Sequence, residues 1–194
     1  MRVDPGQSPG PPAARVFVAL RIAPEIAAAL AEMARVLERF SVRLIAPADI
    51  HLTLVPPWNE TEIPAAVEKL HGVAERAAPF ALAFKHLNYG PHARRPRLLW
   101  AECAGSMELS ALHAALLAAF GQSEERPFRP HVTVVRIRGN GAAVARRQPI
   151  DRELALEQPV ETVELMQSPP ADERGYRVLA SLKLGGEAAP VTAG

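Results

Sequence analysis

The chain has 194 residues, 48% of them hydrophobic, and its 22 lysines and arginines nearly balance 21 aspartates and glutamates. This composition allows a folded domain with a sizeable core and argues against binding of polyanions through a global positive charge. The single cysteine, Cys103, cannot form an intramolecular disulfide, and no apolar run approaches the roughly 20 residues that cross a bilayer. Because the start of the chain also lacks a signal-peptide pattern, we predict a cytoplasmic protein.

The predicted elements begin with an apolar run at residues 14–22, which indicates a buried strand. Ala23, Pro24 and Glu25 then begin a helix that is predicted to run to about Arg39. Its apolar positions recur at helical spacing and form one face, which comprises Ile26, Leu30, Met33 and Leu37. We expect this face to pack on a sheet.

The same layout recurs further along the chain. Residues 97–105 are typical of a strand, and residues 107–120 of a helix that Gly121 ends. The apolar stripe of this helix comprises Leu109, Leu112, Leu116 and Phe120. Each strand and helix leads to a segment of the form His-x-Thr-x, HLTL at 51–54 and HVTV at 131–134. This repetition predicts two pseudo-symmetric lobes.

The remaining segments indicate further helices and strands. Helices are predicted at 61–77 and 141–148, and strands at 80–90, 160–168 and 176–184. The fold class is therefore predicted to be α+β. We expect a single domain at 15–184 between a disordered tail at 1–14 and a flexible tail at 185–194, because both ends are rich in Gly, Pro and small residues.

The two His-x-Thr-x segments carry the residues best suited to chemistry. Side chains alternate across a strand, so His51 and Thr53 share one face of the first segment, as do His131 and Thr133 in the second. If the lobes bring these faces together, a cleft holds two imidazoles and two hydroxyls. An imidazole titrates at about pH 6.5, so one can accept a proton while the other donates one. Cleavage of a phosphodiester requires both transfers, and symmetry alone does not assign them.

Other residues could bind the phosphate or the rest of a substrate. The threonine hydroxyls could donate hydrogen bonds to non-bridging phosphate oxygens, and Arg136, three residues after Thr133, is the candidate cation. Trp58 is either a packing residue at the rim or a platform for stacking a base. The basic run at 91–97 is first interpreted as a solvated loop, with contact to a phosphate backbone as the alternative.

A metal site is disfavoured, because each segment offers one ligand whereas zinc sites generally need three or four. The four other histidines show no comparable pairing; they are His71, His86, His92 and His113. We therefore predict no metal and no other cofactor.

The two segments, together with FRP at 128–130 and Arg136, resemble the HxTx motifs of the two-histidine phosphoesterase superfamily. More narrowly, they are similar to those of the RNA 2′,3′-cyclic phosphodiesterases, historically called 2′-5′ RNA ligases. The similarity extends over roughly 15–184 and includes RVFVALRIAPEI, VRLIAPADIHLTL and GYRVLASLKL.

This resemblance implies a bilobal fold, with two lobes of mixed or antiparallel sheet and outer helices around a central cleft. It implies metal-free hydrolysis of RNA or nucleoside 2′,3′-cyclic phosphates to 2′-phosphomonoesters, with His51 as proton donor and His131 as proton acceptor. One departure concerns VPPWNE at 55–60, because family members often have a basic and aromatic stretch ending in Gly after the first motif.

Other functions stay open on the sequence alone. The cleft could serve another two-histidine phosphodiesterase or 2′-5′ RNA ligase activity, or a non-catalytic module that binds RNA or nucleotides. The duplicated lobes could also form a partner-binding scaffold with buried histidines. We expect RNA or a nucleotide with a 2′,3′-cyclic phosphate as the partner, no membrane association, and a monomer without an obligate protein partner.

Overall fold

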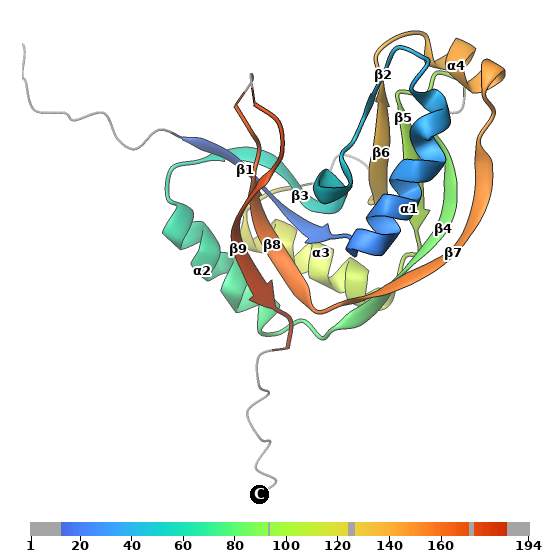
Figure 1. Ribbon diagram of the computed structural model, residues 1–194. Coiled ribbons are helices and arrows are strands. Elements are labelled where there is room, and N and C mark those ends of the chain that lie inside the picture. Colours follow the sequence, from blue (N-terminus) through green and yellow to red (C-terminus); the bar gives the residue numbers. More distant parts are fainter. Residues whose placement is uncertain (1–12, 93, 124–126, 171–172, 186–194) are drawn as a thin grey trace, which may run out of the picture.

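The computed structural model describes residues 13–92, 94–123, 127–170 and 173–185, and it consists of one strongly curved sheet with helices packed on it (Figure 1). The strand order is β7-β4-β5-β6-β3-β1-β8-β9, with the short β2 paired to β6, and every strand pair is antiparallel. The predicted α+β class is therefore confirmed. The tails predicted at 1–14 and 185–194 fall mostly outside the described part of the chain, although Ala14 already belongs to β1.

The strands are β1 Ala14–Arg21, β2 Val42–Leu44, β3 His51–Glu60, β4 Phe80–Gly90, β5 Leu98–Cys103, β6 His131–Ile137, β7 Asp151–Val160, β8 Thr162–Gln167 and β9 Arg177–Lys183. The helices are α1 Pro24–Ala34, α2 Ile63–Ala74, α3 Met107–Ala119 and α4 Gly141–Arg147, and short 3₁₀ turns cover Arg35–Leu37 and Pro47–Asp49. The longest of these helices, α3, has 13 residues, and no described helix is long and apolar enough to cross a membrane.

The sheet divides at the junction of β3 and β6 into two halves of four main strands each. In one half β6 is followed by β5, β4 and β7, and in the other β3 is followed by β1, β8 and β9. The repeat predicts that β1 and β5 are equivalent. They hold equivalent positions in the sheet, because β1 pairs with β3 and β5 pairs with β6. Across the junction Leu52 lies opposite Val132. The predicted lobes are thus the two halves of one continuous sheet.

The two equivalent helices are exchanged between the halves. α1 follows β1 but packs near β6, whereas α3 follows β5 but packs on β3 (Figure 1). In α3, His113 Nδ1–H donates to the Leu54 carbonyl at 2.8 Å, and the imidazole stacks on Phe128 with 3.8 Å between ring centroids. The junction strand of each half is therefore covered by a helix that follows a strand of the other half, whereas α2 packs on β8 and β9.

Local signals explain where the helices begin and end. Pro24 occupies the first turn of α1, where its missing N–H costs nothing. The Ser106 hydroxyl caps α3 by accepting the Leu109 N–H at 3.1 Å. Gly121, with φ of +60°, ends α3 as the sequence predicts. Leu30, Leu109 and Leu116 of the two predicted stripes are buried, so both stripes pack as expected.

Four elements differ from the sequence-based predictions, and one of them is the short β2, which was not predicted. The first predicted helix does not continue to about Arg39, because α1 ends at Ala34 and the chain tightens into a 3₁₀ turn that buries Leu37. β3 continues through VPPWNE to Glu60, where only HLTL was predicted as strand. β7 was not predicted, because as a half-exposed edge strand with many charges it lacks a continuous apolar run.

Close packing at Gly141 yields a prediction about stability. A Cβ atom at this first residue of α4 would overlap the carbonyl oxygen of Pro96, whereas a Cβ at Gly105 would meet nothing within 4 Å. We expect Gly141→Ala to lower the free energy of unfolding by about 1–3 kcal/mol, as overpacked sites do, and Gly105→Ala to change it by about 0.5 kcal/mol or less. Urea unfolding of both variants measures this difference, and equal midpoints would contradict the packing described.

Candidate active site

The two His-x-Thr segments lie side by side at the centre of the sheet. In β3, Leu52 and Leu54 are buried while His51 and Thr53 are half-buried, and β6 repeats this pattern over residues 131–134. Leu52 faces Val132 across the junction, so the polar residues that flank each of them emerge on the other face of the sheet. The structure thus brings both predicted histidines and both predicted threonines together.

Both imidazoles are held in the same way. The Nδ1–H of His51 donates to the Asp49 carbonyl at 2.7 Å, and the Nδ1–H of His131 donates to the Arg129 carbonyl at 2.7 Å. In each case the acceptor lies two residues earlier in the chain. Because a carbonyl can only accept, this contact fixes the tautomer and leaves Nε2 as the ring nitrogen that can exchange a proton with a ligand.

The rings around the two histidines differ. His51 packs between Phe17 and Tyr176, with ring centroids 4.9 Å away in both cases, and Tyr176 stands edge-on to it. His131 packs against Trp100 with 4.4 Å between centroids. These contacts restrict each imidazole to one orientation.

Burial lowers the pKa of both imidazoles below the ordinary value of 6.5, and the Arg136 guanidinium lowers both further. The hydrogen bonds to the carbonyls oppose this shift. Other charges differ between the two rings, since the Asp49 carboxylate raises the pKa of His51 whereas the Arg129 guanidinium lowers that of His131. The Glu102 carboxylate raises the pKa of His131. Both imidazoles are thus held nearer to the neutral form than an exposed histidine.

A small polar hollow of about 40 Å³ lies between the two segments. Its lining comprises Ile45, Asp49, His51, Thr53, His131, Thr133, Arg136 and Tyr176. Arg136 is exposed on β6 and reaches this hollow, as its position after Thr133 predicts. The hollow offers two imidazoles, two hydroxyls and one guanidinium, which together suit an oxyanion.

Trp58 does not join this group. It pairs with Val16, which belongs to the helix-covered core, and its ring contacts Phe120 at the end of α3 with 4.9 Å between centroids. The indole Nε1–H donates to Glu60 at 3.0 Å. The structure therefore places Trp58 as a packing residue, apart from the histidines.

Tyr176 is a site residue that the sequence analysis missed. Its backbone N–H donates to Asp49 Oδ1 at 3.0 Å, which ties the start of β9 to the turn before β3. The turn in question also supplies the carbonyl that holds His51. The one available signal was the segment GYRVLASLKL, whose resemblance to the family includes this tyrosine.

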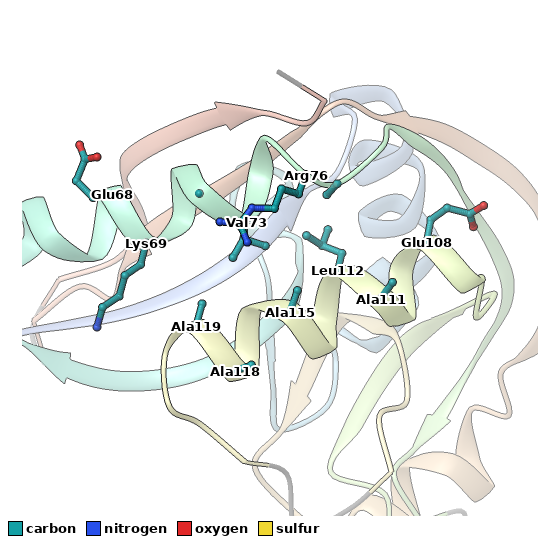
Figure 2. A pocket seen from close by; sticks show the side chains of 12 residues that line it. Glu68, Lys69, Val73, Arg76, Glu108, Ala111, Leu112, Ala115, Ala118 and Ala119 are labelled. Atoms are coloured by element: carbon teal, nitrogen blue, oxygen red, sulfur yellow. The ribbon is translucent and has the colours of Figure 1, made fainter. Parts of the chain in front are cut away.

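A second hollow, of about 470 Å³, adjoins the first at Thr53 and His131, which line both. A third, of about 700 Å³, lies away from the histidines between α2 and α3 (Figure 2). Figure 2 shows Ala111, Ala115 and Ala119 along α3, across from Val73 and Arg76 of α2, and none of the residues that line this hollow is a histidine. Within the described ranges, no group of three or more His, Cys, Asp or Glu side chains is arranged to hold a metal ion.

Known proteins share this sequence pattern. The family model described as the 2′-5′ RNA ligase superfamily matches residues 45–169. The RNA 2′,3′-cyclic phosphodiesterase of Bacillus subtilis is 32% identical over 96 residues, covering 46% of this chain and 52% of the relative. The protein of the same name from Aquifex aeolicus is 30% identical over 102 residues, covering 48% and 54%. The chain thus spans about half the length of the curated relatives it matches.

Solved structures share the fold over a longer stretch. The crystal structure of TT0787 of Thermus thermophilus superimposes with a TM-score of 0.73 at 26% identity, covering 90% of this chain and all of that one, at 100%. E. coli LigT complexed with 3′-AMP gives a TM-score of 0.72 at 21% identity, covering 90% and 99%. The family match extends over more than half of the sequence and includes both His-x-Thr strands, so the chain belongs to the 2′-5′ RNA ligase superfamily.

Proposed function

We propose that the protein hydrolyses RNA or nucleoside 2′,3′-cyclic phosphates to 2′-phosphomonoesters by general acid and base catalysis with His51 and His131. The observation that carries this proposal is the pair of identically anchored imidazoles on either side of one small polar hollow. The curated relatives bear the name RNA 2′,3′-cyclic phosphodiesterase, which supports the same reaction. A cytoplasmic location and a monomeric state, predicted from the sequence, remain part of this proposal.

The reaction uses Nε2 of both rings. Neutral His131 accepts a proton from water through Nε2 while the water oxygen bonds to phosphorus. Protonated His51 donates its Nε2 proton to the 3′ oxygen as the bond between phosphorus and that oxygen breaks. The phosphate stays on the 2′ oxygen, and proton exchange with solvent restores both rings. No metal enters these steps.

One charged side chain beside each ring accords with this assignment of donor and acceptor, while the Arg136 guanidinium lowers the pKa of both rings and the Glu102 carboxylate raises that of His131. Asp49 places a carboxylate near His51, which favours the protonated form that a general acid needs. Arg129 places a guanidinium near His131, which favours the neutral form that a general base needs. The resemblance to the family implies the same assignment.

Thr53, Thr133 and Arg136 are proposed to bind the phosphate. Their hydroxyls and guanidinium line the hollow between the imidazoles, where they can donate to the non-bridging oxygens. Charge on these oxygens must be stabilised throughout the transfer, so such contacts contribute to rate as well as binding. Trp58 has no part in this proposal, because it packs on Phe120.

The same groups permit the reverse reaction, in which an RNA 5′-hydroxyl takes the place of water and forms a 2′-5′ linkage. Water at about 55 M outcompetes such a hydroxyl by mass action. Hydrolysis is therefore the proposed net reaction, and ligation is a side activity of the same site.

We expect His51→Ala and His131→Ala each to lower the rate of 2′,3′-cyclic phosphate hydrolysis by about 10²–10⁴-fold, because each removes one proton transfer. His71→Ala is the matched control, since this exposed histidine on α2 lies 3.6 Å from Glu75 and away from the hollow. The assay measures initial rates with 2′,3′-cyclic nucleotides and with an oligonucleotide ending in a cyclic phosphate. Wild-type rates in folded variants of both site histidines would refute the proposal.

Chelation and product analysis test the metal-free reaction and its direction. We expect full activity after treatment with EDTA and a product that carries its phosphate on the 2′ hydroxyl. Loss of activity on chelation, restored by a divalent cation, would exclude the mechanism proposed. A product with its phosphate on the 3′ hydroxyl would show that the bond between phosphorus and the 2′ oxygen breaks instead.

The lowered pKa values predict the pH dependence of the reaction. Activity falls at low pH as the base becomes protonated and at high pH as the acid loses its proton, so kcat/KM should follow a bell centred below pH 6.5. Arg136→Gln removes a cation that lowers both pKa values, so both limbs should move to higher pH. Arg138→Gln removes the same charge outside the hollow and should leave the limbs nearly in place. Unmoved limbs in Arg136→Gln would contradict the electrostatic account.

A further inference from the structure

The two hollows that meet at the histidines differ in size by an order of magnitude. The polar hollow of about 40 Å³ has room for a small group such as a phosphate, whereas the second hollow has about 470 Å³. Small-molecule sites typically have about 300–1,000 Å³. The second hollow is also larger than the one of about 170 Å³ that adjoins His131 on another side. A ligand whose phosphate lies between the imidazoles therefore finds the most room for its nucleoside in the second hollow.

The second hollow opens on one side of the β3–β6 junction. Because the strands are antiparallel and Leu52 faces Val132, Thr53 and His131 lie on the same side of that pair. These two residues line both hollows. The path from the phosphate into the larger space therefore passes between Thr53 and His131.

The walls of the second hollow suit a nucleoside. Most of its lining is apolar or aromatic, namely Leu54, Pro56, Pro91, Trp100, Pro127 and Phe128. Flat rings and proline faces of this kind pack well against a base.

Two further residues of the lining can carry positive charge, and both are exposed. They are His92, in the loop between β4 and β5, and Arg129. The Arg129 guanidinium lies over the Trp100 ring, 5.3 Å from its centroid, and 3.4 Å from Glu102 Oε1. Glu102 belongs to an adjoining hollow and does not line this one. Arg129 is thus positioned at the second hollow and still presents donors to solvent.

We propose that Arg129 and His92 form a second phosphate-binding site, which takes the phosphate on the 5′ oxygen of the substrate's terminal nucleotide. This proposal rests on the proposed function. When an RNA 3′ end places its cyclic phosphate between the imidazoles and its last nucleoside in the second hollow, the 5′ oxygen continues into the chain through a phosphate. A free 2′,3′-cyclic nucleotide has no such group. The substrate class is therefore the cyclic-phosphate end of an RNA, in preference to the mononucleotide.

The exposed arginines of the same loop extend this surface. Arg94, Arg95 and Arg97 follow His92 in the connection between β4 and β5, and all three are exposed. Backbone phosphates further from the 3′ end would meet this positive charge. The basic run at 91–97 was first interpreted as a solvated loop, and this proposal gives it the RNA backbone as a ligand.

A minimal pair of substrates tests the second site. Adenosine 2′,3′-cyclic phosphate and its 5′-phosphorylated form differ only in the proposed ligand group. We expect the wild-type kcat/KM to be about tenfold or more higher for the 5′-phosphorylated form, as a charge-assisted contact provides. Added KCl should reduce this preference, because the contact is ionic.

The ratio of the two kcat/KM values separates binding at the second site from a general effect on catalysis. Arg129→Gln, which retains the backbone carbonyl that holds His131, should bring the ratio close to one, and His92→Ala should lower it. Arg152→Gln on β7 removes the same charge at an exposed position outside the hollow and should keep the wild-type ratio. A wild-type ratio near one, or an unchanged ratio in Arg129→Gln, would overturn the second site while leaving the proposed hydrolysis intact.

If neither substrate is turned over, the proposed function is refuted. A binding measurement then decides whether the second phosphate-binding site exists. Calorimetric titration then compares adenosine 2′-monophosphate with adenosine 2′,5′-bisphosphate. Tighter binding of the bisphosphate by about tenfold, lost in Arg129→Gln and kept in Arg152→Gln, would support the second site. Equal affinities would exclude it.

Discussion

The pairing of β3 with β6 is the constraint on which the site depends. Leu52 and Val132 face each other across the junction and are fully buried, at 0% exposure, because the exchanged helices cover this face of the sheet. A strand has a period of two, so burying this pair fixes the neighbouring histidines and threonines on the opposite face. A slip of either strand by one residue would turn its own histidine and threonine inward. The apolar core thus sets the geometry of the polar site.

The site combines symmetric anchoring with asymmetric surroundings. Each imidazole donates through Nδ1 to a carbonyl two residues earlier, so both present the same nitrogen to a ligand. Around this matched pair, Tyr176 and the Asp49 carboxylate stand by His51, whereas Trp100 and the Arg129 guanidinium stand by His131. The two His-x-Thr segments supply equivalent imidazoles, and the charged side chains around these imidazoles differ. The second hollow, which is lined by His131 and not by His51, adds a further difference between the surroundings of the two histidines.

Periodicity and spacing were sufficient to predict the two His-x-Thr strands, the helices that follow β1 and β5, and the position of Arg136. Alternation along β3 also places Trp58 on the face of Leu52 and Leu54, but only if the strand continues to Glu60, and the sequence analysis predicted strand for HLTL alone. Tyr176 was missed for a different reason. It meets Asp49 from a position 127 residues later in the chain, and no local pattern encodes such a contact. Motif positions are local properties, whereas the groups that tune them come from tertiary packing.

The exchange of α1 and α3 interlocks the halves of the sheet. Cutting the chain at the loop between β4 and β5 would separate α1 from β6 and α3 from β3, and it would also separate β4 from β5 and β8 from β1. Leu54 or Val134 would then face water. Neither half is therefore an autonomous folding unit, despite the repeat. His51 and His131 lie on opposite sides of this cut, so the site assembles only when both parts of the chain fold together.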